Sequence, residues 1–280
     1  MKVQPFIITA SELPPWYEKQ RFIYSGYRNP EAHSTYTAAL SSVYRWHNET
    51  LNIHTHLWAA ISFCVLFYLC IHQEFYVSLS FLSKVCVVNG FAAAIIMGLA
   101  SAFAHTFYII NKEWYDFSWK VDMVGIVTVL YSHIISDTYI ITVLLLHNIK
   151  LFYFLNALSF FFGAYCIRKV FVENNMFLWA IIYGFVGSFP FTGTLFYFAF
   201  SGPYNYALQS ASILSLYCSL SCVLAATVFY IAKIPERYWP YIVLKSHALH
   251  HIFITIGIYF ALTVILYLKD IEEFSATLLP

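Results

Sequence analysis

The chain has 280 residues, of which 60% are hydrophobic, 20% are aromatic and only 10% are charged, and its mean hydropathy is +0.67. A soluble domain carries about 25% charged residues, so this chain has too few charges to cover a surface that faces water. The composition excludes a soluble globular protein and indicates an integral membrane protein. The formal net charge of +1 gives no support to nucleic-acid binding.

Residues 1–50 form an amphipathic segment before the first long apolar run. The first twenty residues lack the basic region, the long apolar core and the cleavage site of a signal peptide. We therefore expect this segment to remain on the protein and to precede the membrane domain.

Seven apolar runs then follow, each near the length of about 20 residues that crosses a bilayer. The predicted helices occupy residues 51–72, 83–108, 121–146, 150–169, 176–200, 206–232 and 246–268. The short loops between them favour one seven-helix domain over residues 51–269, followed by a tail over residues 270–280. The expected fold class is an all-α integral membrane protein with seven transmembrane helices.

The distribution of Lys and Arg predicts the orientation, because cytosolic loops carry an excess of both residues. If the N-terminus is cytosolic, twelve of the fifteen Lys and Arg residues lie on the inner side. The outer side then holds only Lys84, Lys150 and Lys269. We expect a cytosolic N-terminus and an extracytosolic C-terminus, in the plasma membrane or the endoplasmic reticulum.

Five polar residues of three predicted helices are expected near one membrane depth, at the cytosolic side. Ser101 and His105 are spaced i, i+4 near the end of the second helix, Asp122 begins the third, and His247 and His251 are spaced i, i+4 at the start of the seventh. Residues four apart share a helix face. Each residue also has a simpler role: Ser101 can bond its own helix, and Asp122 can stabilise a helix N-terminus.

The shared depth favours a metal site over these separate explanations. Buried imidazoles are costly in hydrocarbon unless their nitrogens are satisfied. Zinc binds His nitrogens, and three protein ligands with an open fourth position are typical of a catalytic site. We predict that His105, His247 and His251 bind zinc, with Asp122 and Ser101 beside it as the candidate catalytic residues.

Other histidines receive structural interpretations. His54 and His56 are two residues apart, so a helix directs them to different sides, where they are expected to bond backbone or lipid headgroups. His250 is expected next to the face that carries the ligands. His133 and Asp137 are expected to form a solvated pair near the outer headgroups, about 22 Å from Asp122 along the helix for Asp137.

The sequence resembles the progestin and adiponectin receptor (PAQR) family, which is related to haemolysin III. The resemblance covers residues from about 20 to 265 and looks closest to an adiponectin-receptor-like, fungal-type member. Three groups of motifs carry it: SGYRNP (25–30) with HNETLNIHTHL (47–57), SAFAH (101–105) with DMVGI (122–126), and PER (235–237) with SHALHH (246–251).

This resemblance implies seven helices, a cytosolic N-terminus and zinc held by the residues that match the family's histidines, His105, His247 and His251. The family's motif Ser and Asp correspond to Ser101 and Asp122. Members are described as receptors for protein hormones or steroids, as lipid-amide hydrolases acting on ceramide, and as proteins that affect zinc and sterol homeostasis.

Two functions remain open. The first is a zinc-dependent hydrolase of a ceramide-like lipid amide that also serves as a lipid-linked receptor, with membrane lipids, a sterol-like ligand or an extracytosolic protein as partners. In it Asp122 handles the proton of the attacking water and Ser101 supports the site. The second is a receptor or sensor without turnover, in which the zinc is structural. A metal transporter is disfavoured, because helices one, four, five and six offer no Asp, Glu or His at mid-depth.

Overall fold

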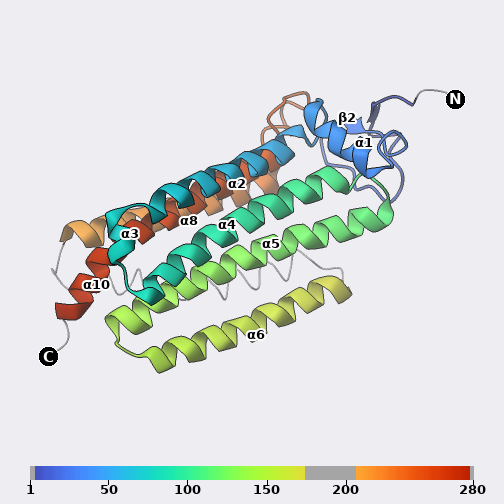
Figure 1. Ribbon diagram of the computed structural model, residues 1–280. Coiled ribbons are helices and arrows are strands. Elements are labelled where there is room, and N and C mark those ends of the chain that lie inside the picture. The colour runs from blue at the N-terminus through green and yellow to red at the C-terminus, as the bar shows by residue number, and fades with distance from the viewer. Residues whose placement is uncertain (1–3, 174–205, 278–280) are drawn as a thin grey trace.

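The computed structural model describes residues 4–173 and 206–277 and is mostly helical (Figure 1). The elements are β1 (Ile7–Thr9), β2 (Ser25–Arg28), α1 (Tyr36–Ser41), a 3-10 turn (Ser42–Tyr44), α2 (Thr50–Ile71), α3 (Glu74–Ser78), α4 (Phe81–Phe107), α5 (Lys112–Thr138), a π-helical stretch (Tyr139–Leu145), α6 (Ile149–Glu173), α8 (Tyr206–Ala232), α9 (Ser246–Thr263), a 3-10 turn (Val264–Tyr267) and α10 (Leu268–Thr277).

Six helical stretches among the described residues are long and apolar enough to cross a membrane: Thr50–Ile71, Phe81–Phe107, Lys112–Leu145, Ile149–Lys169, Leu214–Ala232 and Ser246–Glu273. The all-α integral membrane fold expected from the sequence is therefore confirmed. The predicted helix over 176–200 lies outside the described residues.

The helix that carries Asp122 begins nine residues before its predicted start at 121. The side chain of Asn111 accepts a hydrogen bond from the backbone N–H of Trp114 at 2.9 Å, which caps the helix so that it starts at Lys112. At the other end, α5 continues into the π-helical stretch. The segment expected as a tail after 269 is helical as far as Thr277.

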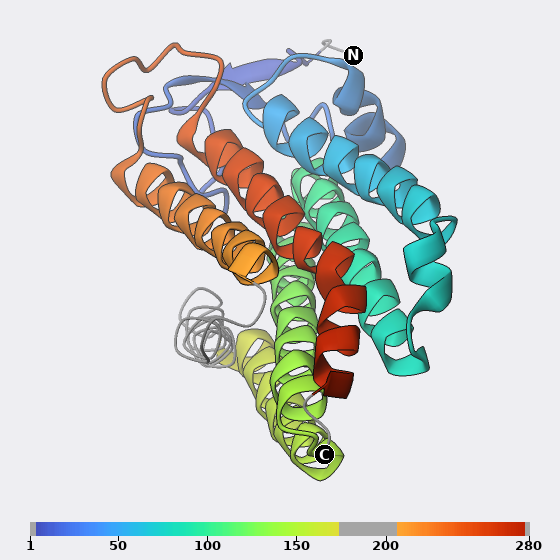
Figure 2. The ribbon, with the colours of Figure 1, turned by 90° about the vertical axis from the view of Figure 1, so that its left-hand side faces the viewer.

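The long helices lie side by side and form one bundle (Figures 1 and 2). α4 packs between α2 and α5, α6 packs on α5, and α9 packs on α8 and α2. Many large apolar side chains point away from the bundle, among them Val65, Phe154, Phe161, Leu224 and Ile231, each at least half exposed. Such surfaces are expected where helices face lipid rather than water.

The two ends of the bundle differ. At one end, which we call the hairpin end, the antiparallel strands β1 and β2 and the helix α1 cover the start of α2 and the turn between α4 and α5. Tyr17 and Tyr27 pack there against Tyr108 and Ile109 in a small core of their own. α3 and α10 lie at the opposite end (Figure 1). Residues 4–50 thus form a cap on the bundle.

Close approach of α2 and α4 depends on a glycine. A Cβ atom at Gly98 would lie 2.9 Å from the backbone oxygen of His56 and 3.1 Å from the Cβ of Ala60. Small residues at helix contacts allow such approach in membrane proteins. Gly98 therefore fixes the position of α2 relative to α4 beside His56.

We expect Gly98→Leu to destabilise the bundle by about 1–3 kcal/mol, because the added side chain must separate two backbones. The matched control is Ala92→Leu on the same helix, where the residue is exposed and the larger side chain enters lipid. Thermal unfolding of both variants in detergent measures the difference, and equal melting temperatures would contradict the packing argument.

Candidate metal centre

Three histidines from two distant segments meet at the hairpin end of the bundle. His105 lies in the last turn of α4, and His247 and His251 lie in the first two turns of α9. One ligand nitrogen from each residue falls within 4.8 Å of the others. The rings are 4.5–5.1 Å apart between centroids. This group could hold a metal ion, in the arrangement that the sequence predicts.

The start of α9 is fixed by a buried carboxylate. Glu236 is only 2% exposed, and one of its oxygens accepts a hydrogen bond from the backbone N–H of Ser246 at 2.7 Å. The Ser246 hydroxyl donates to the other oxygen. An anion at a helix N-terminus satisfies free N–H groups and the helix dipole. Glu236 of the PER motif thereby sets where α9 begins, one residue before His247.

Glu49, which precedes α2 in the chain, binds the third histidine. Its Oε2 atom lies 2.8 Å from His105 Nδ1, and both side chains are completely buried. Glu49 was not predicted from the sequence as part of the site. A ligand histidine usually directs its second nitrogen to such a carboxylate, which fixes the ring orientation. Glu49 is therefore placed to orient His105.

The Glu49 carboxylate is fully satisfied. Besides His105, the side-chain amide of Asn52 donates to Oε2 at 2.6 Å. The amides of Gln20 and Asn48 donate to Oε1, both at 2.6 Å. Burial alone favours the neutral acid, but the hydrogen bond from His105 and the amide donors outweigh it, so the pKa of Glu49 lies below its usual value.

An ionised Glu49 only accepts hydrogen bonds, so His105 carries its proton on Nδ1. In the imidazole form that binds a metal, the other nitrogen, Nε2, then has a free lone pair. His105 Nε2 is buried and has no hydrogen-bond partner among the described residues. A buried nitrogen without a partner is costly unless something binds it. The three imidazoles, of which that of His105 has an unpaired nitrogen, fit a zinc ion.

Arg28, of the SGYRNP motif, holds the end of α4. Its guanidinium is fully buried and donates to the backbone oxygens of His105 and Thr106 and to the hydroxyl of Ser42. These carbonyls belong to the last turn of the helix, which has no intrahelical donors for them. The N-terminal cap therefore fixes His105 through its backbone as well as through Glu49.

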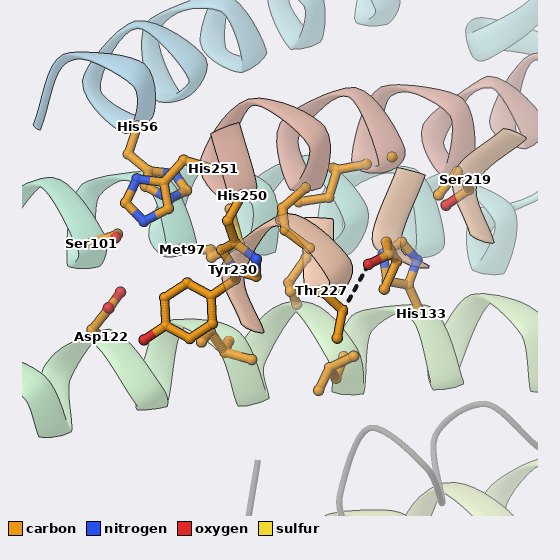
Figure 3. A pocket seen from close by; sticks show the side chains of 18 of the residues that line it. His56, Met97, Ser101, Asp122, His133, Ser219, Thr227, Tyr230, His250 and His251 are labelled. Atoms are coloured by element: carbon orange, nitrogen blue, oxygen red, sulfur yellow. Dashed lines mark hydrogen bonds between the residues drawn. The ribbon is translucent and has the colours of Figure 1, made fainter. Parts of the chain in front are cut away.

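Asp122 and Ser101 lie at the same end of the bundle and point into one cavity with His251 (Figure 3). Both side chains are buried, at 6% and 2% exposure. His247 lines the cavity too, and its ring stacks on Trp119. The predicted convergence of α4, α5 and α9 at one level is thus present, with a carboxylate and a hydroxyl next to the histidine group.

The cavity has a volume of about 410 Å³ and runs between α5, α8 and α9. Most of its wall is apolar, formed by side chains such as Met123, Ile126, Leu220, Val223 and Ile254. Pockets for small molecules have volumes of about 300–1,000 Å³ and combine apolar walls with a few polar groups. This cavity could therefore hold an apolar ligand with a polar head near the histidines.

The predictions for His54 and His56 are only partly confirmed. His54 bonds the backbone oxygen of Val43 at 2.9 Å, as expected, and His250 bonds that of Ala226. His56 instead lies against His251, with 4.0 Å between ring centroids, and lines the cavity. A spacing of two residues could not reveal this, because the contact joins α2 to α9.

His133 and Asp137 do not form the solvated pair that the sequence suggested. Asp137 is only 8% exposed, and both residues line the cavity between α5, α8 and α9. The prediction was wrong because it considered depth alone. The depth of a residue in the membrane does not determine whether its side of α5 faces the bundle or the solvent.

Replacement of Glu49 tests the orientation of His105. We expect Glu49→Gln to weaken zinc binding by roughly 10- to 100-fold, the usual cost of losing the carboxylate behind a ligand histidine. The variant is titrated with zinc in competition with a chromophoric chelator. Glu31→Gln, at an exposed position of the same N-terminal region, is the matched control. Unchanged affinity in Glu49→Gln would show that the carboxylate does not support the ligand.

Comparison with known proteins agrees with these observations. A family model described as haemolysin-III related matches residues 44–262, a range that contains α2, the three histidines and the cavity. An uncharacterized protein of Schizosaccharomyces pombe is 28% identical over 98% of this chain, and the alignment spans 62% of that protein's length, in keeping with a fungal-type member. The chain belongs to the haemolysin-III-related family, as a multi-pass integral membrane protein.

Proposed function

We propose that the protein is a zinc-dependent hydrolase of long-chain lipid amides, such as ceramide, and that this activity links it to lipid, sterol and zinc homeostasis signalling. The observation that carries the proposal is the position of a buried three-histidine group and the Asp122 carboxylate at one end of an apolar cavity. A metal ion that had only a structural role would need neither a cavity nor a second carboxylate beside it.

A zinc ion held by His105, His247 and His251 would supply a Lewis acid that polarises the amide carbonyl and makes water more acidic. Asp122 accepts one proton from the attacking water as its oxygen bonds to the carbonyl carbon. It then delivers this proton to the nitrogen as the C–N bond breaks, which releases a fatty acid and an amine. The Ser101 hydroxyl, which faces the same space, orients Asp122.

The wall of the cavity determines which substrates can bind. Its apolar side chains exclude water from the acyl chain and favour a lipid that enters from the bilayer. The Lys and Arg bias, with Lys84, Lys150 and Lys269 on elements that begin at the opposite end, supports a site on the cytosolic side. A protein ligand would then bind at the end that carries α3 and α10.

We expect Asp122→Asn to abolish the release of fatty acid from a ceramide substrate while zinc stays bound, because the amide cannot take up the proton. The loss should reach at least 100-fold, the range of general acid–base catalysis. Mass spectrometry of the products and elemental analysis of the purified variant provide the two measurements.

Asp116→Asn is the matched control, since Asp116 lies on the same helix but is exposed and pairs with Lys112 at 2.9 Å. It should keep full activity. If Asp122→Asn retained the activity of the unaltered protein, Asp122 would have no part in the reaction.

A receptor whose metal is structural is the second candidate. Its support is that the histidine group joins α4 to α9, two helices with few other contacts between them. If the metal is structural, removal of zinc by a chelator should lower the melting temperature by about 10 °C or more. In a chain of this size, each kcal/mol lost from the free energy of unfolding lowers the melting temperature by about 2–4 °C. Asp122→Asn should leave signalling unchanged. Little change in melting temperature together with complete loss of hydrolysis would reject this candidate in favour of the enzyme.

A further inference from the structure

The cavity extends far beyond the metal centre along α5. Its lining residues on this helix recur every three or four positions from Asp122 to Asp137, so one stripe of the helix faces it throughout. At 1.5 Å per residue, Asp137 lies about 22 Å and His133 about 16 Å from Asp122 along the helix axis. The cavity is thus long enough for an extended acyl chain.

Polar side chains lie at both ends of the cavity, and most of the wall between them is apolar. Asp122 and Ser101 lie at one end, and His133 and Ser219 lie at the other (Figure 3). Asp137 follows His133 by one turn of α5 and lines the same cavity. An unsubstituted hydrocarbon chain would match the middle of this cavity and would leave the second polar end without a partner.

Asp137 is the group that most needs such a partner. The residue is only 8% exposed, and its Oδ2 atom accepts no hydrogen bond from any residue that the structure describes. A buried polar atom that is left unpaired carries a desolvation cost, which a hydrogen bond from a ligand would remove. Ionisable groups inside a membrane are rare and usually mark a path or a binding site.

We propose that this far end, formed by Asp137, His133 and Ser219, binds a hydroxyl group carried near the end of the ligand's acyl chain. The proposal rests on the proposed function only in placing the head of the ligand at the metal centre. A hydroxyl both donates and accepts hydrogen bonds, which suits an aspartate, a histidine and a serine together, whereas an ammonium group only donates.

Length and volume agree with one chain of this kind. A chain of roughly 12 to 18 carbon atoms reaches from Asp122 to the far end, given the axial distance of about 16–22 Å. The cavity volume of about 410 Å³ lies within the range of about 300–1,000 Å³ that small-molecule pockets have. The ligand class is therefore a single long acyl chain with a terminal or near-terminal hydroxyl.

Binding of three fatty acids to the purified chain tests this proposal. Displacement of a fluorescent fatty acid is measured with hexadecanoic acid, 16-hydroxyhexadecanoic acid and 16-aminohexadecanoic acid. We expect the hydroxy acid to bind roughly 5- to 10-fold more tightly than the plain acid, the worth of one net hydrogen bond. Equal or weaker binding of 16-hydroxyhexadecanoic acid would overturn the proposal. If 16-aminohexadecanoic acid bound most tightly, the far end would bind an ammonium group, which would also overturn the proposal of a hydroxyl.

Two variants of Asp137 show whether this residue provides the selectivity. Asp137→Leu should reverse the order, so that the plain acid binds more tightly, because the far end becomes apolar. Asp137→Asn keeps an acceptor of the same shape, and it should retain the preference for the hydroxy acid even if the Leu variant fails to fold. Thr128→Val is the control, because Thr128 lies on α5 outside the cavity lining and its hydroxyl bonds only the backbone oxygen of Val124; it should leave the ratio unchanged. A preference that persists in Asp137→Leu, or one lost equally in Thr128→Val, would contradict the assignment.

The measurement separates this inference from the proposed function, because it records binding and not hydrolysis. Selectivity for the hydroxy acid in a protein that cleaves no amide would support the far-end site and reject the hydrolase. Cleavage of ceramide without any selectivity among the three acids would support the hydrolase and reject the far-end site.

Discussion

The buried hydrogen bond between Glu49 and His105 connects the N-terminal cap to the membrane bundle. A carboxylate with no exposure is stable only if its charge is balanced by donors, and here three amides and an imidazole supply them. Those donors come from the cap, from the start of α2 and from the end of α4. The same contact sets the tautomer of His105 and leaves Nε2 free for a metal. The N-terminal cap and the orientation of His105 in the three-histidine group therefore depend on one interaction.

Much of the fold could be predicted because its physical causes are local. The apolar runs reveal the helices, since no other backbone conformation satisfies its polar groups in lipid apart from a closed barrel. The i, i+4 spacing of His247 and His251 places both on one face of α9, and this spacing holds in the structure. Helix ends were harder to predict, because they depend on single capping contacts such as that of Asn111, which begins α5 well before its apolar run.

The rest of the site could not be predicted, because it depends on contacts between distant segments. Glu49 is separated from His105 by 56 residues, and Arg28 from the same helix end by 77. Nothing in the local sequence distinguishes Glu49 from an ordinary charge at the start of a helix. His56 and Asp137 were misjudged for the same reason. Their spacing gives the direction around their own helix, but only packing against α9 or α8 decides whether that direction is the cavity or the lipid.

Two buried carboxylates of this chain differ in a way that bears on function. Glu49 has donors for both oxygens within the protein, so it needs nothing further and acts as part of the scaffold. Asp137 keeps an oxygen without a partner among the described residues, although it pays a comparable cost of burial. A protein gains no stability from such a group, whereas a ligand that satisfies it gains affinity and selectivity. The unsatisfied carboxylate of Asp137 therefore supports the proposal that a ligand hydroxyl binds at the far end of the cavity.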